Sequence, residues 1–103
     1  MSERILISGV IDLDPANSDA AVEVFSKLMK PTRDEDGCAR YVFSADLDVP
    51  GRFHLSEEWE SEEAMNAHMA TPHIAEFFAA MGGLGVKASS VTRWTGSDPQ
   101  KLM

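Results

Sequence analysis

The sequence predicts a single α+β domain in which two helices pack on one four-stranded antiparallel sheet. Apolar residues alternate in four short segments, as expected of strands, and recur at helical spacing in two segments between them. The order of these segments is βαββαβ, with no linker long enough to separate domains. A chain of 103 residues also has the usual size of one domain.

The first half of the chain predicts a strand, a helix and a second strand. Residues 4–13 alternate in the manner of a strand and carry apolar side chains on both faces. Asp14-Pro15 or Ser18 then offers an N-cap for a helix over residues 16–34, which Gly37 ends. The helix is indicated by apolar residues at helical spacing: Ala21, Val22, Phe25, Leu28 and Met29. Strand-forming residues follow from 38 to 46.

The second half repeats this order after a tight turn. Val49-Pro50-Gly51 places Pro and Gly where a type II turn requires them, so the chain reverses into a strand over residues 52–60. Ser61 begins a helix to about Ala70, which Thr71-Pro72 restarts and Gly82-Gly83 ends. A last strand covers 86–94. We expect one ferredoxin-like domain over residues 1–96 and a C-terminal tail over 97–103.

The two faces of the expected sheet predict a homodimer. Two helices can cover only one face of four strands, yet the segment 4–13 is apolar on both faces. An open apolar face would be a large exposed patch, and packing against a second copy of the chain removes it. We therefore expect two sheets to pack face to face.

Charge and cysteine content exclude several classes of protein. Seventeen acidic residues against nine basic ones give a formal charge of −8, the wrong sign for binding nucleic acid or an anionic membrane. The single cysteine, Cys38, cannot form an internal disulfide, and there is no apolar run of 18 residues or long apolar leader. We expect a cytoplasmic protein.

The sequence predicts neither a metal site nor a cofactor. It contains no glycine-rich phosphate loop, and its histidines and cysteine match no zinc spacing. On one helix, His68 and His73 would point about 140° apart, and Pro72 breaks the run between them. We expect the purified protein to hold no metal, flavin or haem.

Two polar residues stand at positions that the pattern places inside. Glu57 shares a strand face with Leu55 and Trp59, where a carboxylate needs a partner. His68 lies on the helix stripe of two alanines, either as a buried structural histidine or as an acid–base group. The nearby aromatic and methionine positions either pack the core or enclose a flat aromatic guest: Tyr41, Phe43, Phe77, Phe78 and Met81.

Several elements in register resemble the antibiotic biosynthesis monooxygenase (ABM) domain family. They are Gly37-Cys38, Tyr41, the turn from Asp46 to Gly51, Glu57-x-Trp59, Ser61-x-x-Ala64-x-x-x-His68 and Pro72-His73-x-x-x-Phe77. The resemblance covers most of the chain and implies a dimeric ferredoxin-like α+β barrel with a pocket between sheet and helices. Family members include monooxygenases that act on quinols and anthrones with O₂ and without flavin, haem or metal.

The resemblance implies roles for particular residues. His68 would exchange the substrate proton, Glu57 would orient it, and Trp59 would offer a ring face and an indole N–H. Substrate binding would involve Trp59 and four further residues: Tyr41, Phe77, Phe78 and Met81.

Other functions stay open. Haem-degrading relatives have a haem-ligating histidine where this chain has Phe78. A haem-degrading function would therefore lack the residue that binds the iron. An isomerase of a small phosphorylated signal molecule would need cations in the pocket, for which the strands offer Arg40, Arg52, Lys87 and Arg93. A dimer that only binds a small molecule is the third alternative.

Overall fold

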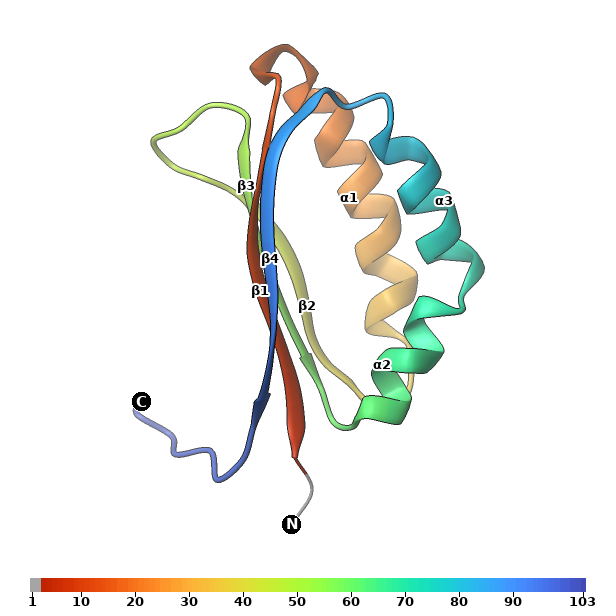
Figure 1. Cartoon of the computed structure of the whole chain (residues 1–103), viewed down its shortest axis with the longest axis vertical. Helices are drawn as coiled ribbons and strands as arrows, with labels where there is room; N and C mark the ends of the chain where they lie inside the picture. Colours follow the sequence, from red (N-terminus) through yellow and green to blue (C-terminus); the bar gives the residue numbers. More distant parts are fainter. Residues whose placement is uncertain (1–2) are drawn as a thin grey trace.

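The structure is a computed structural model and describes residues 3–103. The strands are β1 (Arg4–Leu13), β2 (Cys38–Ala45), β3 (Arg52–Trp59) and β4 (Val86–Gly96). The helices are α1 (Ser18–Arg33), α2 (Glu62–Met69) and α3 (Pro72–Met81), with a 3₁₀ turn, η1 (Pro15–Asn17), before α1. All lie on one face of the sheet (Figure 1).

The four strands form one antiparallel sheet in the order β2-β3-β1-β4. β1 lies at its centre, with Ile5 opposite Trp59 of β3 and Leu6 opposite Trp94 of β4. This order, with the helices on one face, is the ferredoxin-like arrangement that the sequence predicts. The α+β fold class is therefore confirmed.

Local signals account for the ends of the helices. The Asp14 side chain accepts a hydrogen bond from the Ala16 amide, so the segment predicted as one helix from residue 16 begins as the separate turn η1. Ser61 caps α2 by accepting from the Ala64 amide at 3.1 Å. α2 ends at Met69 and α3 begins at Pro72, as the Thr71-Pro72 break predicts.

The turn between β2 and β3 depends on a glycine. The Arg52 amide donates to the Val49 carbonyl at 3.2 Å, and Gly51 has φ of 81°, as at the third position of a type II turn. A Cβ atom on Gly51 would also overlap the carbonyl oxygen of Leu13. Glycine is therefore required here for both backbone conformation and space.

The hydrophobic core lies between the sheet and the helices. Phe25 of α1 stacks on Phe43 of β2 with ring centroids 4.2 Å apart and meets Phe53 of β3 edge-on at 5.0 Å. The largest side chains that are almost fully enclosed are Trp59, Phe25, Leu28, His68 and Thr32.

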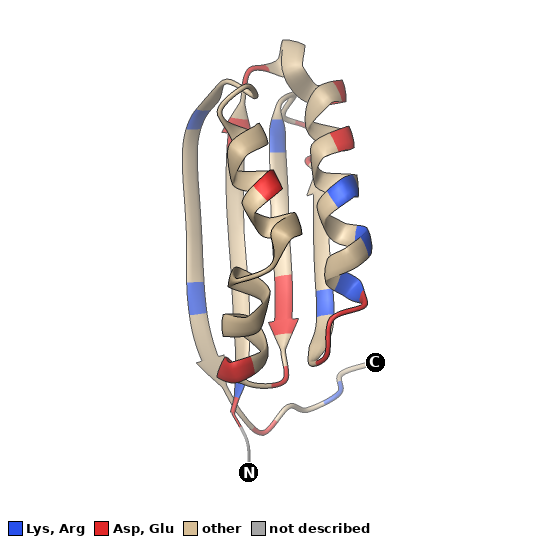
Figure 2. Cartoon of the chain, turned by 90° about the vertical axis from the view of Figure 1, so that its right-hand side faces the viewer, with Lys and Arg blue, Asp and Glu red and all other residues tan. Residues whose placement is uncertain are grey.

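Coverage of the sheet is uneven. The strand β4 is exposed along nearly its whole length and forms one edge of the sheet (Figures 1 and 2). On the face away from the helices, Leu6 is 39% and Trp94 is 59% exposed. Residues 97–103 form neither helix nor strand. Within residues 3–103, no helix has the length and apolar character needed to cross a membrane.

Candidate active site

A cavity of about 340 Å³ lies between the sheet and the pair α2–α3. Its walls are mainly apolar, as is usual for sites that bind small molecules. The apolar lining residues are Ile7, Ile11, Phe43, Leu55, Met69, Ile74, Phe77, Phe78, Met81, Val86 and Val91. The lining residues that carry polar groups are Tyr41, Glu57, His68 and Ser89.

His68 is held rigidly at the wall of this cavity. Its side chain is 2% exposed, and its ring lies 4.8 Å from the Trp59 ring and 5.3 Å from the Tyr41 ring, measured between centroids. The helix α2 presents it there because Ser61 fixes the first turn of α2. Packing on two aromatic rings leaves the imidazole little freedom to change orientation.

The hydrogen-bond partner of His68 is Glu35, in the loop between α1 and β2. His68 Nδ1 lies 2.8 Å from Glu35 Oε2. The expectation that Glu57 would orient His68 is therefore wrong, because Glu57 bonds elsewhere. Since a carboxylate only accepts, Nδ1 carries the proton, and the lone pair of a neutral ring is left on Nε2. Nε2 makes no hydrogen bond within residues 3–103, and its ring lines the cavity.

Glu57 is buried in the cavity wall and paired with Trp59. Its Oε1 accepts a 2.8 Å hydrogen bond from the indole Nε1 of Trp59, two residues later on β3. Trp59 is fully buried and does not line the cavity, so the expected ligand contact of its ring and N–H is not present. The period-two alternation of a strand correctly predicts that both side chains point inward, but not that they satisfy each other.

Burial shifts the acid–base properties of the cavity. Burial raises the pKa of Glu57, with the Trp59 hydrogen bond opposing that rise and the charge of Glu35 adding to it. Burial also raises the pKa of Tyr41 far above its ordinary value, and the Glu57 charge acts in the same direction. The Tyr41 hydroxyl therefore keeps its proton at neutral pH and acts there as a hydrogen-bonding group.

The other residues predicted to bind substrate lie around the cavity. Tyr41 comes from β2, and Phe77, Phe78 and Met81 come from α3. Phe77 is 8% exposed and belongs to the core, whereas Phe78 is 57% exposed. The cavity is thus lined both by buried core side chains and by exposed ones.

The break between α2 and α3 brings His73 to the same carboxylate. His73 Nε2 lies 2.7 Å from Glu35 Oε2, and the ring centroids of His68 and His73 are 6.0 Å apart. The separation of about 140° applies only to one continuous helix, and the break before Pro72 instead lets both imidazoles reach Glu35. The Thr71 hydroxyl donates to the His68 carbonyl at 2.7 Å and accepts from the Ile74 amide, so one residue ends α2 and caps α3.

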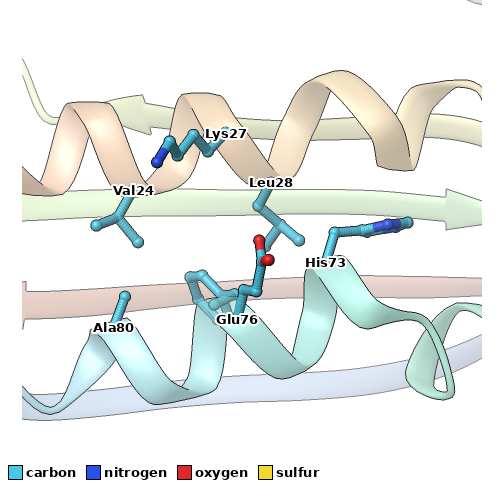
Figure 3. Close-up of a pocket in the computed structure, with 7 residues that line it drawn as sticks. Val24, Lys27, Leu28, His73, Glu76 and Ala80 are labelled. Atoms are coloured by element: carbon cyan, nitrogen blue, oxygen red, sulfur yellow. The ribbon is translucent and has the colours of Figure 1, made fainter.

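His73 also faces a second, shallower hollow. A groove of about 280 Å³ runs between α1 and α3, with His73 at one end and Lys27 and Glu76 on its two walls (Figure 3). The His73 side chain is 20% exposed, compared with 2% for His68. The hydrogen-bonded chain from His68 through Glu35 to His73 therefore runs from the cavity wall to the edge of this groove.

Reasoning from the sequence missed Glu35. It lies in the acidic run Asp34-Glu35-Asp36 before Gly37, a pattern usually read as a solvated loop. The feature of the sequence that could have drawn attention to Glu35 is its position just before Gly37-Cys38, one of the motifs shared with the ABM family. Gly37 has φ of 82°, and its Cα lies so near α2 that a Cβ atom would come within 2.5 Å of the Ala64 Cβ.

Comparison with known proteins identifies the family of the chain. The family model described as antibiotic biosynthesis monooxygenase matches residues 4–80, which include β1 and both segments that carry the site histidines. The chain belongs to this family. The match ends within α3, so β4 and the tail lie beyond it.

Individual ABM relatives extend over most of the chain. Rv0793 of Mycobacterium tuberculosis, named as a candidate monooxygenase, is 31% identical over 78 residues, which is 76% of each chain. The crystal structure of Rv0793 superposes with a TM-score of 0.84 and covers 95% of this chain and 99% of that one, at 26% identity. A candidate ABM protein from Deinococcus radiodurans gives a TM-score of 0.87 at 26% identity, covering 96% and 98%.

Proposed function

We propose that this ABM-family chain is a cofactor-independent monooxygenase that inserts one atom of O₂ into an electron-rich aromatic such as a quinol or anthrone, without using flavin, haem or metal in the reaction. The observation that carries the proposal is an apolar cavity lined by His68, whose Nδ1 is bound to Glu35 and whose Nε2 has no hydrogen-bond partner among residues 3–103. A flat aromatic substrate fits walls of this composition, and the ring nitrogen supplies a base next to it.

The proposed reaction begins with transfer of a proton from the substrate to His68 Nε2. The resulting anion passes one electron to O₂, and the substrate radical and superoxide combine to form a carbon–oxygen bond. His68 Nε2 returns its proton to the peroxide, and loss of water then breaks the O–O bond, so an anthrone and O₂ yield an anthraquinone and water. A 1,4-naphthalenediol and O₂ yield a hydroxynaphthoquinone and water in the same way. The substrate itself supplies the electrons.

Glu35 supports the proton transfer at a distance. It fixes the Nδ1–H tautomer of His68 and places a negative charge beside the imidazolium that forms. It does not line the cavity, so we assign it a positioning role. Tyr41 keeps its proton and is available to donate to the substrate oxygen as charge develops there.

The composition of the cavity favours this reaction over the isomerase. A phosphorylated substrate would require Lys or Arg at the cavity wall, and the residues that line the cavity include neither. A dimer that only binds a small molecule would also need the apolar walls of the cavity. It would not need a base at His68 Nε2.

We also propose that two copies pair through the sheet face that the helices leave open. Leu6 and Trp94 are cross-strand partners on that face and are 39% and 59% exposed. Packing against the same face of a second copy would remove these side chains from water, which is favourable for apolar surface.

The oxygenase is tested by oxygen uptake with anthrone and 1,4-naphthalenediol, corrected for autoxidation with heat-denatured protein. With ¹⁸O₂ we expect one labelled atom in the product and one in water. Uptake equal to the autoxidation control, together with saturable binding of 1,4-naphthalenediol, would support the binding protein instead. Uptake that yields hydrogen peroxide and no labelled product would contradict monooxygenation.

A further inference from the structure

We infer that Glu35, His68 and His73 form a binding site for a divalent first-row transition ion, with Zn²⁺ as the fitting occupant. One donor atom from each residue lies within 4.8 Å of the other two, and Glu35 Oε2 is 2.8 Å from His68 Nδ1 and 2.7 Å from His73 Nε2. Two imidazole nitrogens and one carboxylate oxygen are a donor set that Zn²⁺, Co²⁺ and Fe²⁺ share. This inference goes against the expectation from the sequence that the protein holds no metal, because the fold brings His68 and His73 to one carboxylate. It concerns binding and does not depend on the proposed oxygenase reaction.

The three donor atoms need only small movements to bind one ion. Zn–N and Zn–O distances of about 2.0–2.2 Å in a tetrahedron place donor atoms about 3.3 Å apart. The two donor pairs that share Glu35 Oε2 are 2.8 and 2.7 Å apart, so each would open by about half an ångström. The pair of histidine nitrogens lies within 4.8 Å and would close. Side-chain rotation of Glu35 and His73, which are 14% and 20% exposed, can supply these shifts.

The charges around the three donor residues favour a cation, and two of these residues are partly exposed to solvent. Glu35 stands between Asp34 and Asp36 in the acidic loop after α1, visible as the red segment at the lower end of α1 in Figure 2. The whole chain carries a formal charge of −8. The groove between α1 and α3 is lined by His73 (Figure 3), and the side chains of His73 and Glu35 are 20% and 14% exposed, so two of the three donors are in contact with solvent.

Three protein donors leave one tetrahedral position for water, which is typical of open zinc sites. An ion on Nδ1 also changes what His68 presents to the cavity. A neutral ring that binds a metal through Nδ1 must carry its proton on Nε2, so it becomes an N–H donor and loses its free lone pair. The ion-free and ion-bound forms therefore offer different groups to a ligand in the cavity.

The test uses the untagged full chain after treatment with a chelator. Titration with Co²⁺ is followed by its visible d–d absorption, and competition with Zn²⁺ gives the zinc affinity. We expect one equivalent to bind with the strong absorption of a tetrahedral ion. Glu35→Gln and His73→Ala should each weaken binding by at least about tenfold, because each removes one of three ligands.

The matched control is His54→Ala, which removes the third histidine of the chain. His54 bonds to Asp46 at 2.7 Å on the other face of the sheet and should leave the affinity unchanged. Circular dichroism establishes that each variant is folded. The site is disproved if no ion binds below about 1 mM, if His73→Ala binds as tightly as the wild type, or if His54→Ala weakens binding equally. None of these outcomes bears on oxygen uptake by the ion-free protein.

Discussion

The indole Nε1 of Trp59 donates a 2.8 Å hydrogen bond to Oε1 of Glu57, and both residues lie on the inward face of β3. The pair satisfies a carboxyl group that is only 8% exposed. Burial nevertheless raises the pKa of Glu57, because one hydrogen bond does not replace the hydration of a charged group.

This raised pKa predicts a pH-dependent stability. Between the ordinary pKa of 4.5 and the raised value, the folded state binds more protons than the unfolded state, so the free energy of unfolding falls as pH rises. Glu57→Gln has no carboxyl group at this position, so its free energy of unfolding should not fall with pH for this reason. The stability of the variant relative to wild type should rise with pH through this window and level off above it. Urea unfolding at a series of pH values measures the difference, and a flat difference would contradict the assignment.

Replacing His68 separates a catalytic from a structural role. His68→Ala should lower the rate of oxygen uptake with anthrone by about 10²–10⁴, the usual contribution of a general base. It should also cost about 1–3 kcal/mol of stability, because it leaves a small cavity and removes one of the two histidine hydrogen bonds to Glu35. Uptake and the urea midpoint are compared with His54→Ala as the control. A lowered midpoint with unchanged uptake would make His68 a structural residue.

Gly37 should be intolerant of any side chain. Gly37→Ala places a Cβ atom 2.5 Å from that of Ala64 at a positive φ, so we expect a loss of about 1–3 kcal/mol. Gly82→Ala is the matched control, because Gly82 has φ of −60° and its Cβ atom would meet the Ala79 carbonyl oxygen at an ordinary contact distance of 3.8 Å. Thermal unfolding of both variants measures the effect. Equal midpoints would show that the loop before β2 can move away from α2.

A charge on the open face of the sheet should prevent dimer formation. Trp94→Glu places a carboxylate at the proposed interface, and light scattering should then give half the mass found for the wild type. Val22→Glu changes a residue of α1 that is 50% exposed and should leave the mass unchanged. A wild-type protein that scatters as an 11.3 kDa monomer at micromolar concentration would disprove the interface.

Local patterns were sufficient to predict the elements and their order. Alternation in residues 4–13, the Pro50-Gly51 turn and the Ser61 cap act over a few residues, and the structure places a strand, a type II turn and a helix start there. The end of β4 at Gly96, two residues beyond the prediction, depends on pairing with Arg4 across the sheet. Pairing of that kind leaves little trace in the sequence of one strand.

The fold class, the family and the inward positions of Glu57, His68 and Phe77 can be predicted from the sequence, because each follows from periodicity or from motifs in register. Which polar groups meet depends on the folded chain. Glu35 reaches His68 and His73 across 33 and 38 residues, and the break at Thr71 turns the two imidazoles toward it. Hydrogen bonds between such distant residues are set by how the loop after α1 packs against α2 and α3, which no local pattern records.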